Sequence, residues 1–204
     1  MKNHLFHVLG VLTLCALLAV QLGCSSSPPS RFYLLSSLDT TRPEMKPSAD
    51  ERCFSIGIGP VKIPEYLNQP EIVTRGRGNQ LKLAEFDRWS EGLNVNITRV
   101  LAENLSVLLC TETIAIFPWR GGITLDYRIE LDIQRFDGYL GGDVSLNAWW
   151  RLLSGDGKTL LQSKRTSVSE SAGGGDYESL VLVQSRTLEK LSREVAEAIK
   201  TLPK

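Results

Sequence analysis

The clearest pattern in the chain is a strict alternation of apolar and polar residues over 125–134. This alternation predicts a β-strand with one face buried and the other in water. Its phase shifts at 135–136, which is typical of a bulge or bend. Alternation returns over 144–153 and 159–168, and the Gly-Asp-Gly sequence at 155–157 predicts a tight turn between them. These three segments predict an antiparallel meander.

Two segments carry apolar residues at intervals of three and four, which places those side chains on one face of a helix. The first extends from about Leu93 to Cys110, with Asp87 or Asn94 as candidate N-terminal caps. Asn104 is among its polar positions, so we expect this residue on the side away from the core. The pattern predicts an amphipathic helix packed on a sheet.

The second helical segment extends from about Tyr177 to Thr201. A coiled-coil seam is one interpretation, but a seam needs strong apolar residues at successive heptad positions. Gln184 and Ala198 weaken the stripe, so packing across the sheet is favoured. On the polar face of the central meander strand the pattern also places Trp149, among Ser, Asn and Arg residues.

The stretch 54–89 organises the N-terminal half of the domain. A strand beginning near Phe54 should end by Pro64, because prolines at 60 and 64 each remove a backbone donor. A turn-rich loop follows over 65–70, and the segments 71–75 and 80–84 then predict a hairpin. The fold class we expect is α/β: a single domain with a mixed β-sheet, a C-terminal antiparallel meander and flanking helices.

The N-terminus predicts a lipoprotein. Residues 1–23 have a positive start and a short uncharged apolar run, the pattern of a signal peptide. A small residue then precedes Cys24, and residues 24–30 predict the lipidated cysteine and a flexible tether. Ser25, in place of aspartate, resembles the sorting signal for the outer membrane. We therefore expect residues 31–204 to form a domain anchored on the periplasmic face of that membrane; an ordinary secretory signal with an incidental cysteine is the alternative.

Composition excludes several functions for the mature chain. Residues 1–23 contain both histidines and one of 23 basic residues, so 22 basic residues face 23 acidic ones. A chain without a basic surplus is a poor nucleic-acid binder, and a chain without histidine has no His-dependent nucleophile or zinc site. Glu130 and Asp132 could pair in carboxylate catalysis, but their alternation with apolar residues favours a solvated strand face. We expect no catalytic residue, metal or cofactor.

Cys53 and Cys110 are the two thiols that remain once Cys15 is removed and Cys24 is acylated. Because the periplasm is oxidising, a disulfide between Cys53 and Cys110 is expected, with two buried free thiols as the alternative.

The loop after the first motif strand carries candidate interface residues. Tyr66 and Leu67 lie between two prolines, which limit the entropy that the loop loses on docking. With Pro70, Arg75 and Trp89 they form our candidate surface for a partner or for a second copy of the chain. The alternative is that Tyr66 and Leu67 fold back onto the core.

Three motifs resemble one known family: Ile-Gly-x-Gly-Pro-Val-x-Ile-Pro-x-Tyr-Leu from Ile56, Pro-x-Ile-Val-Thr-Arg from Pro70, and Leu-x-Leu-Ala-Glu-Phe-Asp-Arg-Trp ending at Trp89. They resemble the PqiC/YmbA-type ABC-transport auxiliary lipoproteins. Gln69 and Gly92 depart from the arginine and the proline that are usual there.

The resemblance implies an architectural subunit that docks an MCE-domain protein at the outer membrane, assembled as a ring of copies. Such a subunit supports lipid transport between the two membranes and envelope integrity, and another subunit hydrolyses ATP. An outer-membrane assembly factor or receptor for another client is the alternative function. A carboxylate-dependent envelope hydrolase is a third.

Overall fold

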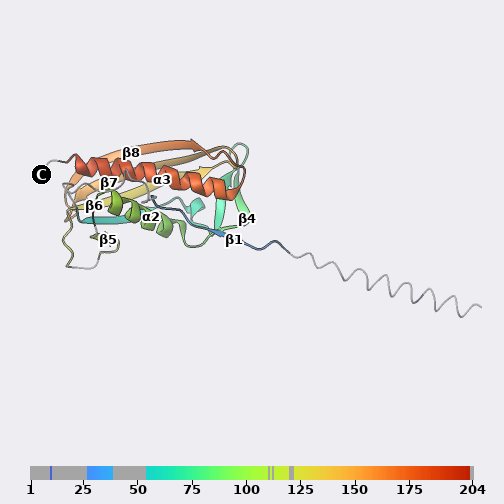
Figure 1. The fold of residues 1–204 in the computed structure, drawn as a ribbon, viewed down its shortest axis with the longest axis horizontal. Coiled ribbons are helices and arrows are strands. Elements are labelled where there is room, and N and C mark those ends of the chain that lie inside the picture. The colour runs from blue at the N-terminus through green and yellow to red at the C-terminus, as the bar shows by residue number, and fades with distance from the viewer. Residues whose placement is uncertain are drawn as a thin grey trace, which may run out of the picture.

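The computed structural model has two β-sheets and two long helices (Figure 1). It describes Gly10 and residues 27–38, 54–109, 111, 113–119 and 122–202. Cys24, Cys53 and Cys110, with the lipid anchor and the disulfide expected there, lie outside the described residues. Within the described ranges, no helix is both long and apolar enough to cross a bilayer.

The larger sheet has five strands in the order β5-β2-β6-β7-β8. Their bounds are β2 Ile56–Lys62, β5 Ile114–Ile116, β6 Tyr127–Gly138, β7 Asp143–Ser154 and β8 Leu160–Ser171. Strand β2 runs parallel to both β5 and β6, whereas β6, β7 and β8 pair antiparallel. The expected mixed sheet and C-terminal meander are confirmed.

The predicted phase shift in β6 is a register shift between Ile133 and Arg135 in its pairing with β7. Before the shift the apolar residues of β6 face the helices, and after it Phe136 returns to that buried face. Close packing explains why residue 57 of β2 is a glycine. A Cβ at Gly57 would lie 2.8 Å from the side chain of Leu125 and 2.9 Å from that of Trp119. The strand can pass beneath those side chains only with glycine at this position.

The smaller sheet has three strands in the order β1-β4-β3, and the sequence pattern did not separate it from the larger one. Its strands are β1 Arg31–Tyr33, β3 Glu71–Arg75 and β4 Leu81–Trp89, with the short 3-10 helix η3 at Glu65–Leu67. The hairpin of β3 and β4 is confirmed, but β4 continues to Trp89 instead of ending near Ala84. Parallel pairing with β1, at the N-terminal side of the domain, supports this extension.

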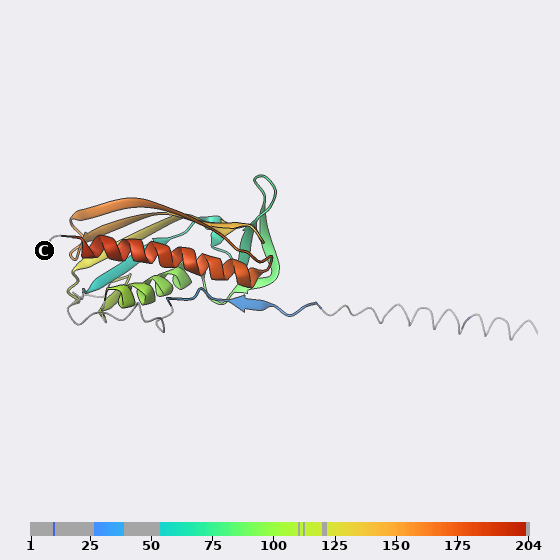
Figure 2. The same cartoon turned by 45° about the horizontal axis from the view of Figure 1, so that its top comes forward.

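Helices α2 (Leu93–Leu108) and α3 (Tyr177–Lys200) lie side by side and cover one face of the larger sheet (Figures 1 and 2). The apolar stripe of α3 is buried against that face, as the spacing predicted. The expected caps of α2 are wrong: Gly92 precedes the helix without a side-chain cap, and Asn94 lies inside the helix. Asp87 lies in β4, where its carboxylate binds Arg31 and Tyr33. In α3, Asp176 accepts from the backbone N of Ser179 at 2.7 Å.

The segment after β1 is hydrogen-bonded to both helices. The amide of Leu35 donates to Asn96 Oδ1 at 2.8 Å, and that of Leu38 donates to Asn104 Oδ1 at 2.7 Å. Asn104 Nδ2 then donates to Ser192 Oγ of α3 at 3.0 Å. The expectation that Asn104 faces away from the core is therefore wrong: its side chain is fully buried and joins three elements.

Candidate docking surfaces

The loop that carries the first interface candidates folds back onto the domain. Leu67 is 2% exposed and packs in the hydrophobic core, so a partner has almost no surface of this side chain to bind. Tyr66 is half-buried, and its hydroxyl donates to Asp137 Oδ2 at 2.6 Å. Leu67 was expected at a docking surface, and the structure shows that this expectation is wrong. Its side chain packs on the domain's own core, which was the alternative.

Asp137 is a fully buried carboxylate that binds side chains from three elements. Arg75 of β3 donates through Nε and Nη2, each at 2.9 Å, and Arg135 of β6 donates through Nε at 2.9 Å. Tyr66 of η3 completes the set, with the Arg75 guanidinium 5.8 Å from the centre of its ring. Asp137 thus joins the smaller sheet and the loop to the larger sheet, directly after the register shift in β6.

The ionisation of this cluster favours a structural role. Burial acts to raise the pKa of Asp137, but hydrogen bonds from Arg75, Tyr66 and Arg135 outweigh it and hold that pKa below its usual value. Burial, together with the hydrogen bond to Asp137, raises the pKa of Tyr66 to about 12. Near neutral pH Asp137 therefore stays ionised and Tyr66 stays protonated. Neither group has a pKa near the working pH, which a general acid or base needs.

The other three interface candidates, Pro70, Arg75 and Trp89, lie in two different parts of the domain. Arg75 belongs to the Asp137 cluster, whereas the backbone N of Trp89 donates to the carbonyl of Pro70 at 2.8 Å. Pro70 and Trp89 line a groove of about 380 Å³ that Ser90 and Glu91 continue. Pro70 is exposed there, but the ring of Trp89 is buried. Of the five candidates, Pro70 is exposed, Tyr66 and Arg75 are half-buried, and Leu67 and Trp89 are buried.

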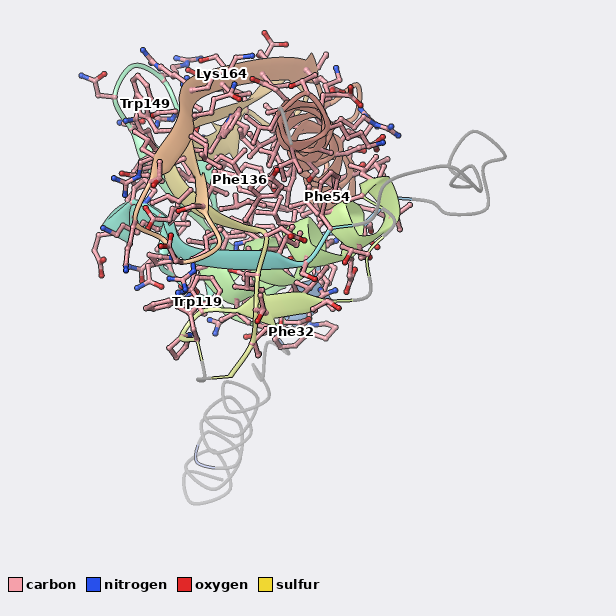
Figure 3. The ribbon with its side chains drawn as sticks, turned by 90° about the vertical axis from the view of Figure 1, so that its left-hand side faces the viewer. Phe32, Phe54, Trp119, Phe136, Trp149 and Lys164 are labelled. Carbon is pink, nitrogen blue, oxygen red and sulfur yellow. The ribbon has the colours of Figure 1, made fainter. Side chains whose placement is uncertain are left out.

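The open face of the larger sheet, opposite the helices, carries an aromatic residue that the interface candidates did not include. Trp149 of β7 is 43% exposed on this face (Figure 3), whereas the next residue, Trp150, is buried and donates from its indole to Thr166 at 3.0 Å. The pattern had already placed Trp149 on the polar face. A large aromatic residue at a solvent-facing position of an amphipathic strand is the signal that identifies it.

Charged residues flank Trp149 in an ordered way. The strand register places Lys62, Asp132, Trp149 and Arg165 in one cross-strand row. In the adjacent row, Arg151 binds Glu130 at 2.6 Å. A shallow hollow of about 250 Å³ lies against these side chains. We call this area the Trp149 face; tryptophan is among the residue types that contribute most to protein–protein binding.

Among the described residues, no group of three His, Cys, Asp or Glu side chains could hold a metal ion.

Comparison with known proteins gives a consistent result. The model of a family described as "ABC-type transport auxiliary lipoprotein component" matches residues 33–196. The intermembrane transport lipoprotein PqiC of Escherichia coli (strain K12) is 23% identical over 181 residues, which is 89% of this chain and 92% of that protein. PqiC of Shigella flexneri matches with the same identity and coverage.

Two crystal structures share the fold. Protein XCC0632 from Xanthomonas campestris is 13% identical with a TM-score of 0.66, covering 82% of this chain and 93% of that one. An uncharacterized protein is 19% identical, also with a TM-score of 0.66, covering 84% of this chain and 99% of that one. At these identities the similarity shows the architecture and not the function.

Proposed function

Because the chain belongs to the family of ABC-type transport auxiliary lipoprotein components, we propose that it is anchored in the outer membrane and docks an MCE-domain partner there. The family match over nearly all of the described domain is the observation that carries this proposal. Two relatives named intermembrane transport lipoproteins support the further step to lipid transport between membranes. The role is architectural, and ATP hydrolysis belongs to another subunit of the system.

The anchor in this proposal is Cys24. Acyl chains on this cysteine hold the protein at the bilayer, because each buried methylene contributes about 0.8 kcal/mol. Where the chain enters the domain, Arg31 of β1 forms an ion pair with Asp87 at 2.7 Å, and the Tyr33 hydroxyl donates to the same carboxylate at 2.8 Å. The first strand is thereby attached to the smaller sheet, so the anchor holds a folded domain close to the membrane.

The anchor is tested by Cys24→Ala. The lipidated protein should incorporate palmitate and fractionate with the outer membrane, and the Cys24→Ala chain should do neither. Palmitate labelling of the Cys24→Ala chain, together with unchanged fractionation, would show that the anchor lies elsewhere.

We assign docking of the partner to the Trp149 face. The exposed ring offers a large apolar area at low entropic cost, and the flanking charges offer orientation and specificity. The sheet beneath it is held rigid by the meander pairing and by the two helices on its other face. A periplasm-spanning partner would therefore meet a surface that does not have to rearrange.

The docking experiment compares Trp149→Ser with Phe117→Ser, which removes a similarly exposed aromatic ring (47%) from beside α2. After detergent extraction of envelope membranes, the Trp149→Ser chain should lose the MCE-domain partner, and the Phe117→Ser chain should retain it. Retention by both, or loss from both, would place the contact elsewhere, and recovery of an unrelated outer-membrane client would support the assembly-factor alternative.

The proposal includes a ring of copies, with the exposed Pro70 and its groove as the candidate contact. The mass of the detergent-solubilised complex tests this, because Pro70→Arg should lower the mass to that of a single copy.

A further inference from the structure

The segment that follows the tether exposes apolar side chains on a side where a surface strand normally carries polar ones. Phe32 is 64% exposed and Leu34 is 46% exposed. Tyr33 and Leu35 alternate with them and point inward, Tyr33 to Asp87 and Leu35 into the core. Both sides of this segment are therefore apolar, although the fold buries only one.

The exposed side chains belong to a larger surface. Phe32 and Leu34 share a hollow of about 400 Å³ with Leu182 of α3, which is 54% exposed. The adjoining turn between β6 and β7 adds two further exposed residues, Tyr139 and Leu140. This turn lies beside the start of α3, because Gly141 packs against Gly175.

These residues occupy one end of the domain, which we call the entry end. In Figures 1 and 2 it is the end where β1 lies and α3 begins, opposite the C-terminus. Figure 3, seen from the opposite end, shows Phe32 well separated from Trp149. The apolar entry end and the Trp149 face are thus distinct surfaces.

The distance from the lipid anchor identifies what can cover the entry end. Six residues lie between Cys24 and Arg31, and the seven Cα–Cα steps from one to the other span at most about 25 Å when fully extended. The polar headgroup layer of one leaflet accounts for about 5–7 Å of that distance. A tether this short holds the apolar side chains next to the bilayer at a high effective concentration, so even a weak contact would be occupied.

We propose that the entry end rests on the membrane that holds the lipid anchor, with Phe32 and Leu34 inserted at the level of the headgroups. This inference rests on the proposed anchor at Cys24. The long axis of α3 would then lead away from the membrane, which leaves the Trp149 face open to the periplasm.

The chemistry of the entry end favours apolar contact with lipid over electrostatic attraction. Arg31 is already paired with Asp87, and the nearby start of α3 carries Asp176 and Glu178. Of the described residues that line the hollow, none is basic and Glu178 is acidic, so the hollow itself offers no attraction for anionic headgroups. Phenylalanine and leucine at the boundary between water and acyl chains need no such charge.

Photo-crosslinking in cells tests the contact on the full lipidated chain. Phe32 and Leu34 are replaced one at a time by p-benzoylphenylalanine, and Phe117, which is about as exposed as Leu34, is replaced in the same way as a control away from the entry end. After irradiation, the intact mass of the purified protein should show phospholipid adducts at positions 32 and 34 and none above background at position 117.

A second measurement places the crosslinker on α3, so that Phe32 and Leu34 themselves can be substituted. With p-benzoylphenylalanine in place of Leu182, lipid adducts should form, and they should be lost when Phe32→Ser and Leu34→Ser are added. Adducts at 32 and 34 that join two copies of the chain or another protein, or no adducts at all, would overturn the proposal.

Palmitate labelling and membrane fractionation are measured on the same preparations. If both fail, the anchor at Cys24 is wrong. If both succeed without lipid adducts, the anchor stands and the membrane contact of the entry end is wrong.

Discussion

Asp137 is the residue whose surroundings depend most on the tertiary structure. Its carboxylate is fully buried and accepts hydrogen bonds from Tyr66, Arg75 and Arg135. A buried charge that loses its partners is strongly destabilising, whereas one with several well-placed donors is accommodated. The side chains of Tyr66 and Arg75, which the sequence suggested as contacts for a partner, serve this internal charge.

Replacing the carboxylate should therefore destabilise the domain. We expect Asp137→Asn to lower the free energy of unfolding by about 3 kcal/mol, since the arginines keep their positive charge and lose the negative one. Equilibrium unfolding in urea measures this change. The matched control is Asp132→Asn on the exposed face of the same strand, where a change within about 0.5 kcal/mol is expected. Equal losses in the two variants would contradict the assigned role.

The same carboxylate should make stability depend on pH. Its pKa lies below the ordinary value in the folded protein, so the unfolded chain binds a proton at a higher pH than the folded chain does. The stabilisation is then complete above about pH 4, the pKa of an unfolded aspartate, and is lost as pH falls through the lower folded value. The difference in unfolding free energy between the wild type and Asp137→Asn should shrink below pH 4, and a constant difference from pH 6 to pH 2 would argue against this cause.

At the scale of elements, the segment 35–38 is held by side chains of both helices. Asn96 and Asn104 of α2 accept from its backbone, and Ser185 Oγ of α3 accepts from the amide of Ser36 at 3.0 Å. The helices therefore do more than cover the sheet: they hold the segment that leads from β1 into the domain. Phe32 and Leu34 of the entry end lie directly before this hydrogen-bonded segment.

Asn104→Leu tests this arrangement. The substitution keeps the size of the side chain but leaves the amide of Leu38 without its acceptor and removes the donor to Ser192 Oγ, which should cost about 2 kcal/mol of stability. Hydrogen exchange at the Leu38 amide should accelerate by more than the global loss of stability explains. Asn94→Leu, at an exposed position of the same helix, should change neither quantity; unchanged exchange at Leu38 in Asn104→Leu would show that the contact is dispensable.

At the scale of the whole molecule, the domain has three surfaces with different character. One face of the larger sheet is buried under α2 and α3, and the other presents Trp149 among charges. The entry end presents Phe32 and Leu34 next to the tether. This separation suits a protein that contacts a membrane at one site and a partner at another.

The disulfide between Cys53 and Cys110 remains a prediction from the sequence. Their neighbours Phe54 and Leu109 are both core residues. A bond closing a loop of about 60 residues would stabilise the domain by about 4 kcal/mol in the chain-entropy model. Thiol titration of the unfolded, unreduced protein should find no free thiol at either position, and two reactive thiols would show that the cysteines are unpaired.

From the sequence alone, the elements with strong local signals were determined well. The meander, its bulge, both long helices and the family resemblance followed from apolar spacing and from motifs, because these signals lie within a few residues of each other along the chain. The sequence also placed Trp149 on the correct face of its strand, because successive side chains of a β-strand point to opposite faces of the sheet.

Only the tertiary structure decided how distant polar groups are paired. The burial of Asn104, the hydrogen bonds from Tyr66 and Arg75 to Asp137, and the pairing of β1 with β4 in the smaller sheet each bring together segments more than thirty residues apart in sequence. Periodicity reports whether a position faces the core or water, but not which distant group meets it there. A polar residue at a buried position therefore looks solvent-facing until its partner is known. For the same reason the loop residues Tyr66 and Leu67 resembled a docking surface in the sequence, whereas in the fold Leu67 is buried in the core and the half-buried Tyr66 donates to Asp137.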